Sequence, residues 1–244
     1  MRDIFETRQT RLPWGPQKLN LCYDRTCNLA CSSCRSEVYK ASAEDHRRTE
    51  YLSDRVQREL APQARQLISG TGDPFASRAY RRLLEELPLR LSLLESVHLH
   101  SNGLLRDGTA WQDMREVQPF VRSAEISIDA ASAATYAVNR GGNFERLLEN
   151  LAFLAGLPVD ITLSFVVQHN NYQEMQGFVD LAKGLGFGVY FSQLVNWGTY
   201  RREEFLQRAV HLPQHPEHLH FCSVLQEVAV QQRVDIGNLR SVLR

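Results

Sequence analysis

Short apolar runs of strand length alternate along this chain with longer segments of helical periodicity. Such alternation is typical of successive βα units, in which parallel strands form one sheet and the connecting helices pack outside it. We expect six strands, at about Lys18–Asp24, Gln66–Ser69, Ser96–Ser101, Ala124–Asp129, Asp160–Val167 and Gly188–Gln193. The clearest helices are predicted over Ala76–Leu87, Asn143–Leu157 and Tyr172–Leu185. The pattern therefore indicates the α/β class.

Several of these strands alternate between apolar and polar residues, whereas strands covered by helices on both faces are apolar throughout. In the third strand, Val97 and Leu99 alternate with His98 and His100. Because neighbouring side chains on a strand point to opposite faces, one face of the sheet is predicted to be polar. This favours a partial (β/α)6 barrel of parallel strands, with outer helices, a polar inner face and a short C-terminal helical cap. An open sheet with one face in solvent is the alternative. In both cases, ligands are expected at the carboxyl ends of the strands.

The composition indicates an ordinary globular chain and excludes several classes of function. The 244 residues are 43% hydrophobic, and 28 Lys and Arg balance 28 Asp and Glu, so the formal net charge is zero. Without a long block of like charges, neither a nucleic acid nor a membrane is expected as a partner. The sequence has no apolar run of about 18 residues and no export signal, which predicts a cytoplasmic protein. We expect one domain over residues 1–244, with a core at about 17–197 and a cap at about 198–244.

Three of the five cysteines lie within eight positions, directly after the first predicted strand. Cys27, Cys31 and Cys34 have the spacing C-x3-C-x2-C, and this uneven spacing favours metal or redox chemistry over disulfide bonds. Three thiolates can bind three irons of a cubane cluster and leave the fourth iron open to a substrate or cofactor. A structural zinc site is the alternative, with Cys22 as its fourth ligand.

The cysteine motif and several further stretches, in the same order along the chain, resemble the radical S-adenosylmethionine (radical SAM) enzymes. The resemblance extends from about Gln17 to Leu194. It implies that Cys27, Cys31 and Cys34 are the catalytic residues and bind one 4Fe-4S cluster. It also implies contacts with S-adenosyl-L-methionine (SAM) from the stretches SGTGDPF, HSNG, SIDA, NRGGNF and FSQLVNWG. The residues concerned are Gly70, Thr71, Gly72, Asp73, Asn102, Ser127, Asp129, Arg140, Leu194 and Val195.

The resemblance also implies how some of these residues contact SAM. The turn that contains Asp73 would accept hydrogen bonds from the ammonium group of SAM. Asp129 would contact the ribose, and Arg140 would pair with the carboxylate. Taken alone, the glycines are equally typical of turns, Asp129 of a helix cap and Arg140 of a surface charge. Many members of the family carry an aromatic residue before the last cluster cysteine, whereas this chain has Ser33 there.

In the family, the reduced cluster cleaves SAM to a 5′-deoxyadenosyl radical, which abstracts hydrogen from the substrate. The resemblance therefore implies an enzyme that acts on a peptide or a small sugar-like or amino-acid-like molecule and needs an external electron donor such as flavodoxin or ferredoxin. Candidates for facing the substrate are Asn20, Asp24, His98, His100, Glu125, Gln168, Tyr190 and Ser192, and Gln193 adjoins this set. The alternative is a noncatalytic zinc or iron–sulfur module that regulates or scaffolds a partner.

The style of the sequence is similar to the SPASM/twitch branch of the family, whose C-terminal extension binds auxiliary clusters. That extension is expected to be missing, because Cys222 is the only cysteine after Cys34. One thiolate cannot build a second cluster, so one cluster per chain is predicted.

The C-terminal stretch is rich in histidine and allows two interpretations. Zinc binding is one, by His211, His215, His218, His220 and Cys222. We favour the other, in which Pro216 starts a helix that docks on the open side of the barrel through an apolar face. The residues of that face are Leu219, Phe221, Leu225 and Val228. The stretch VDIGNLRSVLR is expected to form an extended cap.

Overall fold

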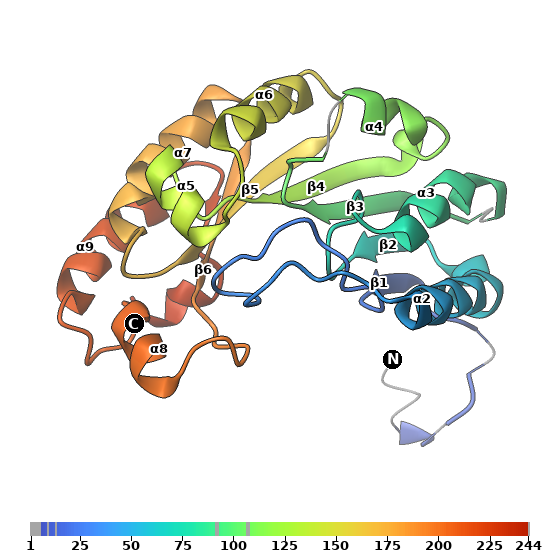
Figure 1. The fold of residues 1–244 in the computed structure, drawn as a ribbon, viewed down its shortest axis with the longest axis horizontal. Helices are drawn as coiled ribbons and strands as arrows, with labels where there is room; N and C mark the ends of the chain where they lie inside the picture. The colour runs from blue at the N-terminus through green and yellow to red at the C-terminus, as the bar shows by residue number, and fades with distance from the viewer. Residues whose placement is uncertain (1–5, 9, 13, 91–92, 106–107, 244) are drawn as a thin grey trace.

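The computed structural model describes residues 6–8, 10–12, 14–90, 93–105 and 108–243. Within these residues the chain forms one sheet of seven parallel strands, whose order in space follows their order in the sequence (Figure 1). The strands are β1 Lys18–Leu21, β2 Gln66–Ser69, β3 Ser96–Ser101, β4 Val121–Ser127, β5 Asp160–Val167, β6 Gly188–Gln193 and β7 Val234–Asp235. The described helices include α2 Ala43–Arg55, α3 Arg78–Arg90, α4 Gly108–Asp113, α5 Ala133–Asn139, α6 Phe144–Ala155, α7 Met175–Gly184, α8 Arg202–Arg208 and α9 His218–Ala229. The α/β class predicted from the sequence is confirmed.

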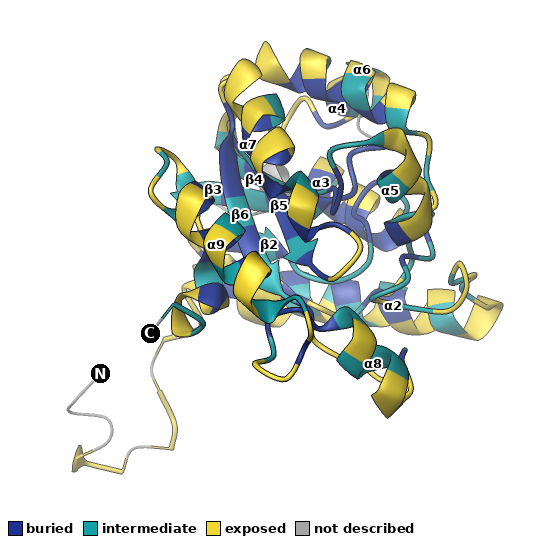
Figure 2. Ribbon diagram, turned by 90° about the vertical axis from the view of Figure 1, so that its left-hand side faces the viewer, coloured by how far each residue is buried: buried dark blue, intermediate teal, exposed yellow. Residues whose placement is uncertain are grey.

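The two faces of the sheet differ in burial, as the alternation of residues predicts. In β3, Val97 and Leu99 are fully buried, whereas His98 and His100 are half-buried. The buried face packs against the helices, and Figure 2 shows the strands as a dark layer beneath helices with yellow outer surfaces. The half-buried face is the concave side of the curved sheet. The fold is therefore a partial barrel with a polar interior.

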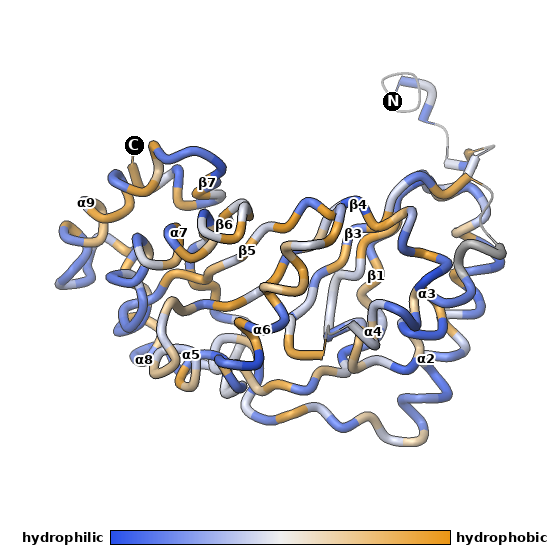
Figure 3. Tube along the Cα trace, turned by 90° about the horizontal axis from the view of Figure 1, so that it is seen from above, coloured by the Kyte–Doolittle hydropathy of each residue, from blue (hydrophilic) through white to orange (hydrophobic). Residues whose placement is uncertain are grey.

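The helices cover the sheet through apolar stripes. In α6, Leu147, Leu151 and Leu154 are fully buried on one side of the helix. The helix begins after Asn143, whose side chain accepts a hydrogen bond from the Arg146 amide at 2.8 Å. Hydrophobic segments follow the strands in Figure 3, whereas α2 is mostly hydrophilic. Within the described residues, no helix is long and apolar enough to cross a membrane.

The C-terminal segment differs from its prediction in two respects. Val234–Asp235 forms a short seventh strand that pairs with β6, and Gly237–Ser241 is a 3-10 helix rather than an extended cap. A two-residue strand carries no periodic pattern, so the sequence could not indicate it. Helix α9 buries Phe221 as expected, but Leu219 is 83% exposed. Residues two positions apart on a helix point about 200° away from each other, so Leu219 lies on the face opposite Phe221. The prediction that Leu219 docks on the barrel is wrong.

Candidate functional site

The three clustered cysteines lie on the long connection between β1 and α2, residues 22–42, which we call the cysteine loop. Figure 1 shows this loop passing from β1 towards α5 and the end of β6. The Ser32 amide donates to the Asn139 carbonyl at the end of α5, at 3.1 Å. The Thr199 hydroxyl, which follows β6, donates to the Ser33 carbonyl at 3.4 Å. The loop thus reaches the carboxyl ends of strands far from its own.

The start of the cysteine loop is fixed by Tyr80 of α3. The phenol oxygen of this buried residue accepts from the Tyr23 and Asp24 amides, at 3.1 and 3.0 Å, and donates to the Leu21 carbonyl at 3.1 Å. Sequence reasoning did not single out Tyr80, because an aromatic residue in an amphipathic helix is ordinarily a core residue. Its hydroxyl terminates β1 and directs the chain into the loop.

Asp24 was predicted to face the substrate, and the structure corrects this. It lies beyond the end of β1, which is shorter than expected, and is only 3% exposed. Its carboxylate accepts hydrogen bonds from the Thr26 amide at 2.8 Å, from the Thr26 hydroxyl at 2.6 Å and from the Ser77 hydroxyl at 2.5 Å. Asp24 therefore stabilises the cysteine loop instead of lining the barrel.

The SGTGD stretch after β2 packs directly on the backbone of the cysteine loop. Gly72 has a φ of +69°, and a Cβ there would lie 2.5 Å from the Thr26 carbonyl oxygen, so only glycine fits. The Asp73 amide donates to the same carbonyl at 2.8 Å, and the Thr71 hydroxyl donates to the Asp24 carbonyl at 3.1 Å. Gly70 is equally close-packed, because a Cβ at this position would lie only 2.5 Å from Cys22 Sγ.

Asp73 turns its carboxylate into the protein rather than towards the barrel interior. The carboxylate accepts from the Asn102 amide at 2.8 Å, the Ser101 hydroxyl at 2.9 Å and the Phe75 amide at 3.0 Å. Burial raises the pKa of Asp73, while these hydrogen bonds lower it. In this structure, the side chain predicted to accept from the SAM ammonium instead joins the ends of β2 and β3.

Asn102 connects the end of β3 to the cysteine loop. Its side-chain amide donates to Asn28 Oδ1 at 2.8 Å and approaches Cys27 Sγ at 3.8 Å. Its own Oδ1 accepts from the Leu104 amide at 3.0 Å, which fixes the orientation of the side chain. Asn102 therefore positions Cys27, and Asn28, which sequence reasoning missed, completes this link.

Asp129 and Arg140 form a buried ion pair beside the cysteine loop. Arg140 Nη1 lies 3.0 Å from Asp129 Oδ2, with side-chain exposures of 11% and 2%. The Arg140 Nε is buried and has no hydrogen-bond partner. Burial raises the pKa of the Cys31 thiol, and the neighbouring Arg140 charge acts in the opposite direction. A guanidinium with a free donor next to a thiolate can hold a further anionic group.

The remaining residues predicted to contact SAM lie at the same end of the sheet. Ser127, the last residue of β4, accepts a hydrogen bond from the Ser164 hydroxyl at 3.2 Å. Leu194 is buried and Val195 partly exposed, directly after β6. Asp129 is not the cap of α5, because Ser132 holds that position; Glu174 accepts hydrogen bonds from the Ala131 amide and the Ser132 hydroxyl, just before the helix. No sequence pattern marks Glu174, which comes from the β5–α7 connection.

Most of the residues predicted to face the substrate lie on the concave face of the sheet. Asn20 of β1, Tyr190 and Ser192 of β6, and the group on β3 and β4 described next all lie on this face. Gln168 differs, because it follows β5 and is only 1% exposed. Its side-chain carbonyl oxygen is buried without a hydrogen-bond partner, so it does not line the interior as expected.

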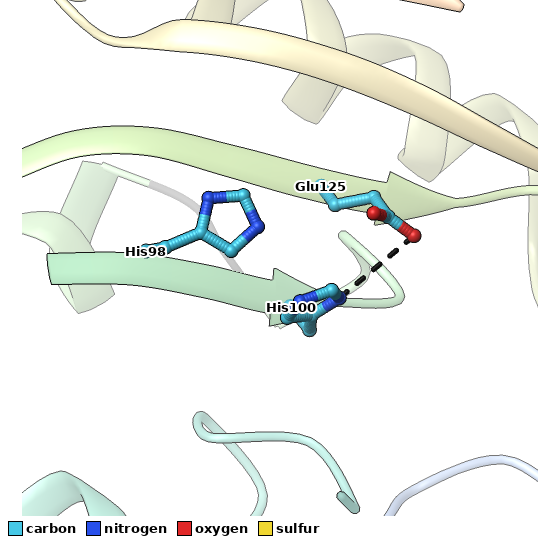
Figure 4. Close-up of side chains that lie close together, drawn as sticks. All are labelled: His98, His100 and Glu125. Atoms are coloured by element: carbon cyan, nitrogen blue, oxygen red, sulfur yellow. Dashed lines mark ion pairs between the residues drawn. The ribbon is translucent and has the colours of Figure 1, made fainter. Parts of the chain in front are cut away.

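His98, His100 and Glu125 gather on the concave face (Figure 4). His100 Nδ1 lies 3.8 Å from Glu125 Oε1, and the two imidazole rings are 4.7 Å apart in an edge-on arrangement. Burial lowers the pKa of both histidines and raises the pKa of Glu125. Within the part of the chain that the structure describes, these residues form the only group of three His, Cys, Asp or Glu ligand atoms lying within 4.8 Å of one another.

Two kinds of metal site were considered for the cysteine loop, a 4Fe-4S cluster and a structural zinc ion. The sulfurs of Cys27, Cys31 and Cys34 do not all lie within 4.8 Å of one another. Thiolates on one zinc ion, with Zn–S bonds of about 2.3 Å, lie about 3.8 Å apart. A cubane cluster instead holds its thiolates at separate corners. The three sulfurs are therefore not in the arrangement that thiolates adopt on one zinc ion, and the unpartnered Arg140 donor beside Cys31 can hold an anionic group next to the loop.

Three of the four histidines of the C-terminal stretch make hydrogen bonds, whereas the buried Nδ1 of His211 has no partner. His215 Nε2 lies 2.9 Å from the Gln207 carbonyl, and His218 Nδ1 lies 3.1 Å from the Val210 carbonyl. His220 Nδ1 lies 2.9 Å from the Tyr172 hydroxyl. No three ligand atoms of this fully described stretch meet within 4.8 Å. The helical interpretation of the stretch is therefore confirmed, with α9 starting at His218.

The fold and the cysteine loop define a partial-barrel protein with a thiolate site at the carboxyl end of its strands. A family model for the radical SAM superfamily matches residues 23–182, which contain all three loop cysteines. The chain therefore belongs to the radical SAM superfamily. The comparison with curated proteins gives no match.

Solved structures of radical SAM proteins share this fold. SuiB of Streptococcus suis, bound to the precursor peptide SuiA, superposes with a TM-score of 0.62 and 11% identity over 99% of this chain and 53% of that chain. SuiB bound to S-adenosylmethionine gives 0.60 and 11%, over 93% and 52%. Native anSMEcpe with AdoMet and a peptide gives 0.58 and 17%, over 90% and 63%. The chain thus spans about half the length of SuiB.

Proposed function

We propose that this protein is a radical SAM enzyme that abstracts a hydrogen atom from a peptide or a small polar molecule. The observation that carries the proposal is the cysteine loop at the carboxyl end of the curved sheet, with Cys31 beside the unpartnered Nε of Arg140. Cys27, Cys31 and Cys34 would hold a 4Fe-4S cluster, which would supply the electron for the cleavage of SAM to methionine and a 5′-deoxyadenosyl radical that takes hydrogen from the substrate.

The residues around the loop hold SAM and exclude water from it. Arg140 offers its free Nε to the SAM carboxylate, while Asp129 holds the guanidinium in place. Gly72 lets the SGTGD turn approach the loop closely enough to close the site on one side. Leu194 and Val195, directly after β6, would flank the adenine. Asn102 fixes Cys27 and so contributes to the orientation of the cluster.

The substrate enters the polar concave face of the sheet. This face offers hydrogen-bonding groups from β1, β3, β4 and β6, and an open cleft of about 440 Å³ lies between β3, β4 and the amino-terminal halves of β5 and β6. Polar groups on an open surface suit a peptide or another hydrated substrate better than a lipid. The solved structures of SuiB and anSMEcpe described above contain peptides, which supports the peptide class. An external donor such as flavodoxin or ferredoxin would supply the electron.

The proposal is tested by anaerobic reconstitution with iron and sulfide, reduction, and measurement of 5′-deoxyadenosine formed from SAM. We expect about four irons and four sulfides per wild-type chain. Cys31→Ala removes one cluster ligand, so its 5′-deoxyadenosine should fall to the level of the reaction without protein.

Cys222→Ala is the matched control, because it removes a thiol from α9, where Cys222 contacts His218 rather than the loop. This variant should retain the iron and the activity of the wild type. Equal SAM cleavage by wild type and Cys31→Ala would overturn the proposal.

A further inference from the structure

We propose that His98, His100 and Glu125 form a second metal site, which binds one divalent transition-metal ion of the zinc or ferrous class on the concave face of the sheet. The site is separate from the cysteine loop and is built from two neighbouring strands. Its ligands are two imidazoles and one carboxylate, a set that suits such ions and leaves coordination positions open.

The backbone places all three side chains on one face. His98 and His100 are two residues apart on β3, so both point to the concave side. In the parallel register, His98 lies beside Ser123 and His100 beside Glu125. Figure 4 shows the His100 ring directed at the Glu125 carboxylate, with His98 on the same side of the two strands. Two successive pairs of facing residues on β3 and β4 thus supply the three ligands.

The distances allow the three groups to reach one ion. One ligand atom from each residue lies within 4.8 Å of the other two, and the His100–Glu125 pair is already at 3.8 Å. Ligands at about 2.0–2.2 Å from one ion lie about 3–3.5 Å apart, so closure needs movements of about 1 Å. The side chains are half-buried, which leaves them room to rotate.

Ser123 forms a hydrogen bond with His98 of the kind that orients a metal-binding histidine. His98 Nδ1 lies 2.6 Å from the Ser123 hydroxyl. When Nδ1 donates its proton to this oxygen, the lone pair of the imidazole is on Nε2, which is then free to bind metal. Metal-bound histidines commonly use their second nitrogen in this way, and the partner raises metal affinity.

The proposed site is open to solvent and to ligands. The cleft of about 440 Å³ is lined by His98 and Glu125, and by polar side chains of β5, β6 and β7 that include Thr162, Tyr190 and Asp235. An ion bound here would keep open positions facing this cleft, where an oxygen or nitrogen of the substrate could coordinate. That role for the ion rests on the proposed function, whereas metal binding itself does not.

Zinc is the probe for this site. The cluster-loaded chain is dialysed anaerobically against micromolar Zn²⁺, bound zinc is measured per chain, and its ligands are determined by X-ray absorption at the zinc edge. We expect one zinc per chain with nitrogen and oxygen ligands and without sulfur. Replacing all three loop cysteines with alanine should leave this zinc in place.

Variants distinguish this site from adventitious binding. His98→Ala and Glu125→Gln should abolish stoichiometric zinc, and Ser123→Ala should weaken binding about tenfold through the lost support of His98. His46→Ala, which changes an exposed histidine of α2, should have no effect. Circular dichroism confirms that each variant is folded.

The proposal is overturned if no zinc binds, if sulfur ligates it, or if the His98 and Glu125 variants retain it. Failure of zinc binding in a chain that still forms 5′-deoxyadenosine would refute this inference alone. Zinc binding without SAM cleavage would refute the proposed function alone.

Discussion

Asp129 joins three elements at the carboxyl end of the sheet. Its carboxylate accepts from the Val166 amide at 2.7 Å and from Arg140, while its carbonyl accepts from the Asn139 and Asn171 side chains at 2.9 and 3.0 Å. Its φ of +60° is unfavourable for a residue with a Cβ, by about 1 kcal/mol. The four hydrogen bonds offset that cost, which makes Asp129 a positioning residue for Arg140.

A double-mutant cycle tests the coupling of this buried pair. Arg140→Met leaves the Asp129 charge buried without its partner, and should lower the free energy of unfolding by about 3 kcal/mol. Adding Asp129→Asn removes that charge, so the double variant should lose less than the sum of the single losses. Urea unfolding at neutral pH measures all four proteins.

The exposed pair of Arg233 and Asp160 is the control for this cycle, because its side chains are 54% and 68% exposed. Arg233→Met should cost less than about 1 kcal/mol. Strict additivity of the Asp129 and Arg140 substitutions would contradict the coupling.

His211 makes the stability of the C-terminal region depend on pH. Burial, together with the nearby His218 and His215, lowers the pKa of His211 from its ordinary 6.5 to about 4. The unfolded chain therefore binds more protons than the folded chain between these values. The stabilisation is complete above about pH 6.5, and the free energy of unfolding should fall as the pH falls towards 4.

Comparing wild type with His211→Leu across this range isolates the effect of His211. The variant has no proton to gain, so its free energy of unfolding should fall less steeply between pH 6.5 and pH 4. Parallel curves for the two proteins would show that His211 does not carry the dependence.

Among the elements, the cysteine loop depends most on residues outside itself. Its start is held by Tyr80, its middle by Asn102 and Asn139, and its later part by Thr199. The loop ends where α2 begins, at a capping box in which Ser42 and Asp45 exchange hydrogen bonds. The loop geometry is thus set by the sheet ends on which the loop lies.

Tyr80→Phe tests this dependence. The change removes one hydroxyl and leaves the Tyr23 and Asp24 amides without their acceptor, while the Leu21 carbonyl keeps the Gly70 amide as a donor; the loss should cost about 2 kcal/mol. Because the loop start is loosened, the reconstituted variant should also lose iron faster in the presence of a chelator.

Tyr51→Phe changes an exposed tyrosine of α2 and should alter stability by less than about 0.5 kcal/mol, with wild-type iron retention. Iron release at the same rate in Tyr80→Phe and Tyr51→Phe would argue against a role of Tyr80 in holding the loop.

At the scale of the whole molecule, the sheet and its polar interior could be predicted from periodicity. The periodic patterns that mark strands and helices involve residues only a few positions apart in the sequence. The alternation in β3 correctly places His98 and His100 on the concave face. The cysteines could be found because their spacing is local. All of these signals lie in neighbouring positions of the chain.

Features that depend on distant residues could not be predicted. The bonds from Tyr80 to the loop start join residues 56 to 59 positions apart. The approach of Glu125 to His100 depends on a register shift between Val97 and His98, which slides β4 along β3. Asp24 was misplaced because polar residues continue past Leu21 without marking where the strand ends. Pattern analysis has no access to such contacts.

The long-range supports of the cysteine loop have a consequence for biosynthesis. The three cysteines leave the ribosome early. The residues that hold the loop in shape, Asn102, Asn139 and Thr199, are translated at least 75 positions after Cys27. A nascent chain therefore displays its thiols before it can arrange them. We therefore expect iron–sulfur delivery to follow the synthesis of most of the polypeptide, so that maturation machinery would meet a folded acceptor rather than a growing one.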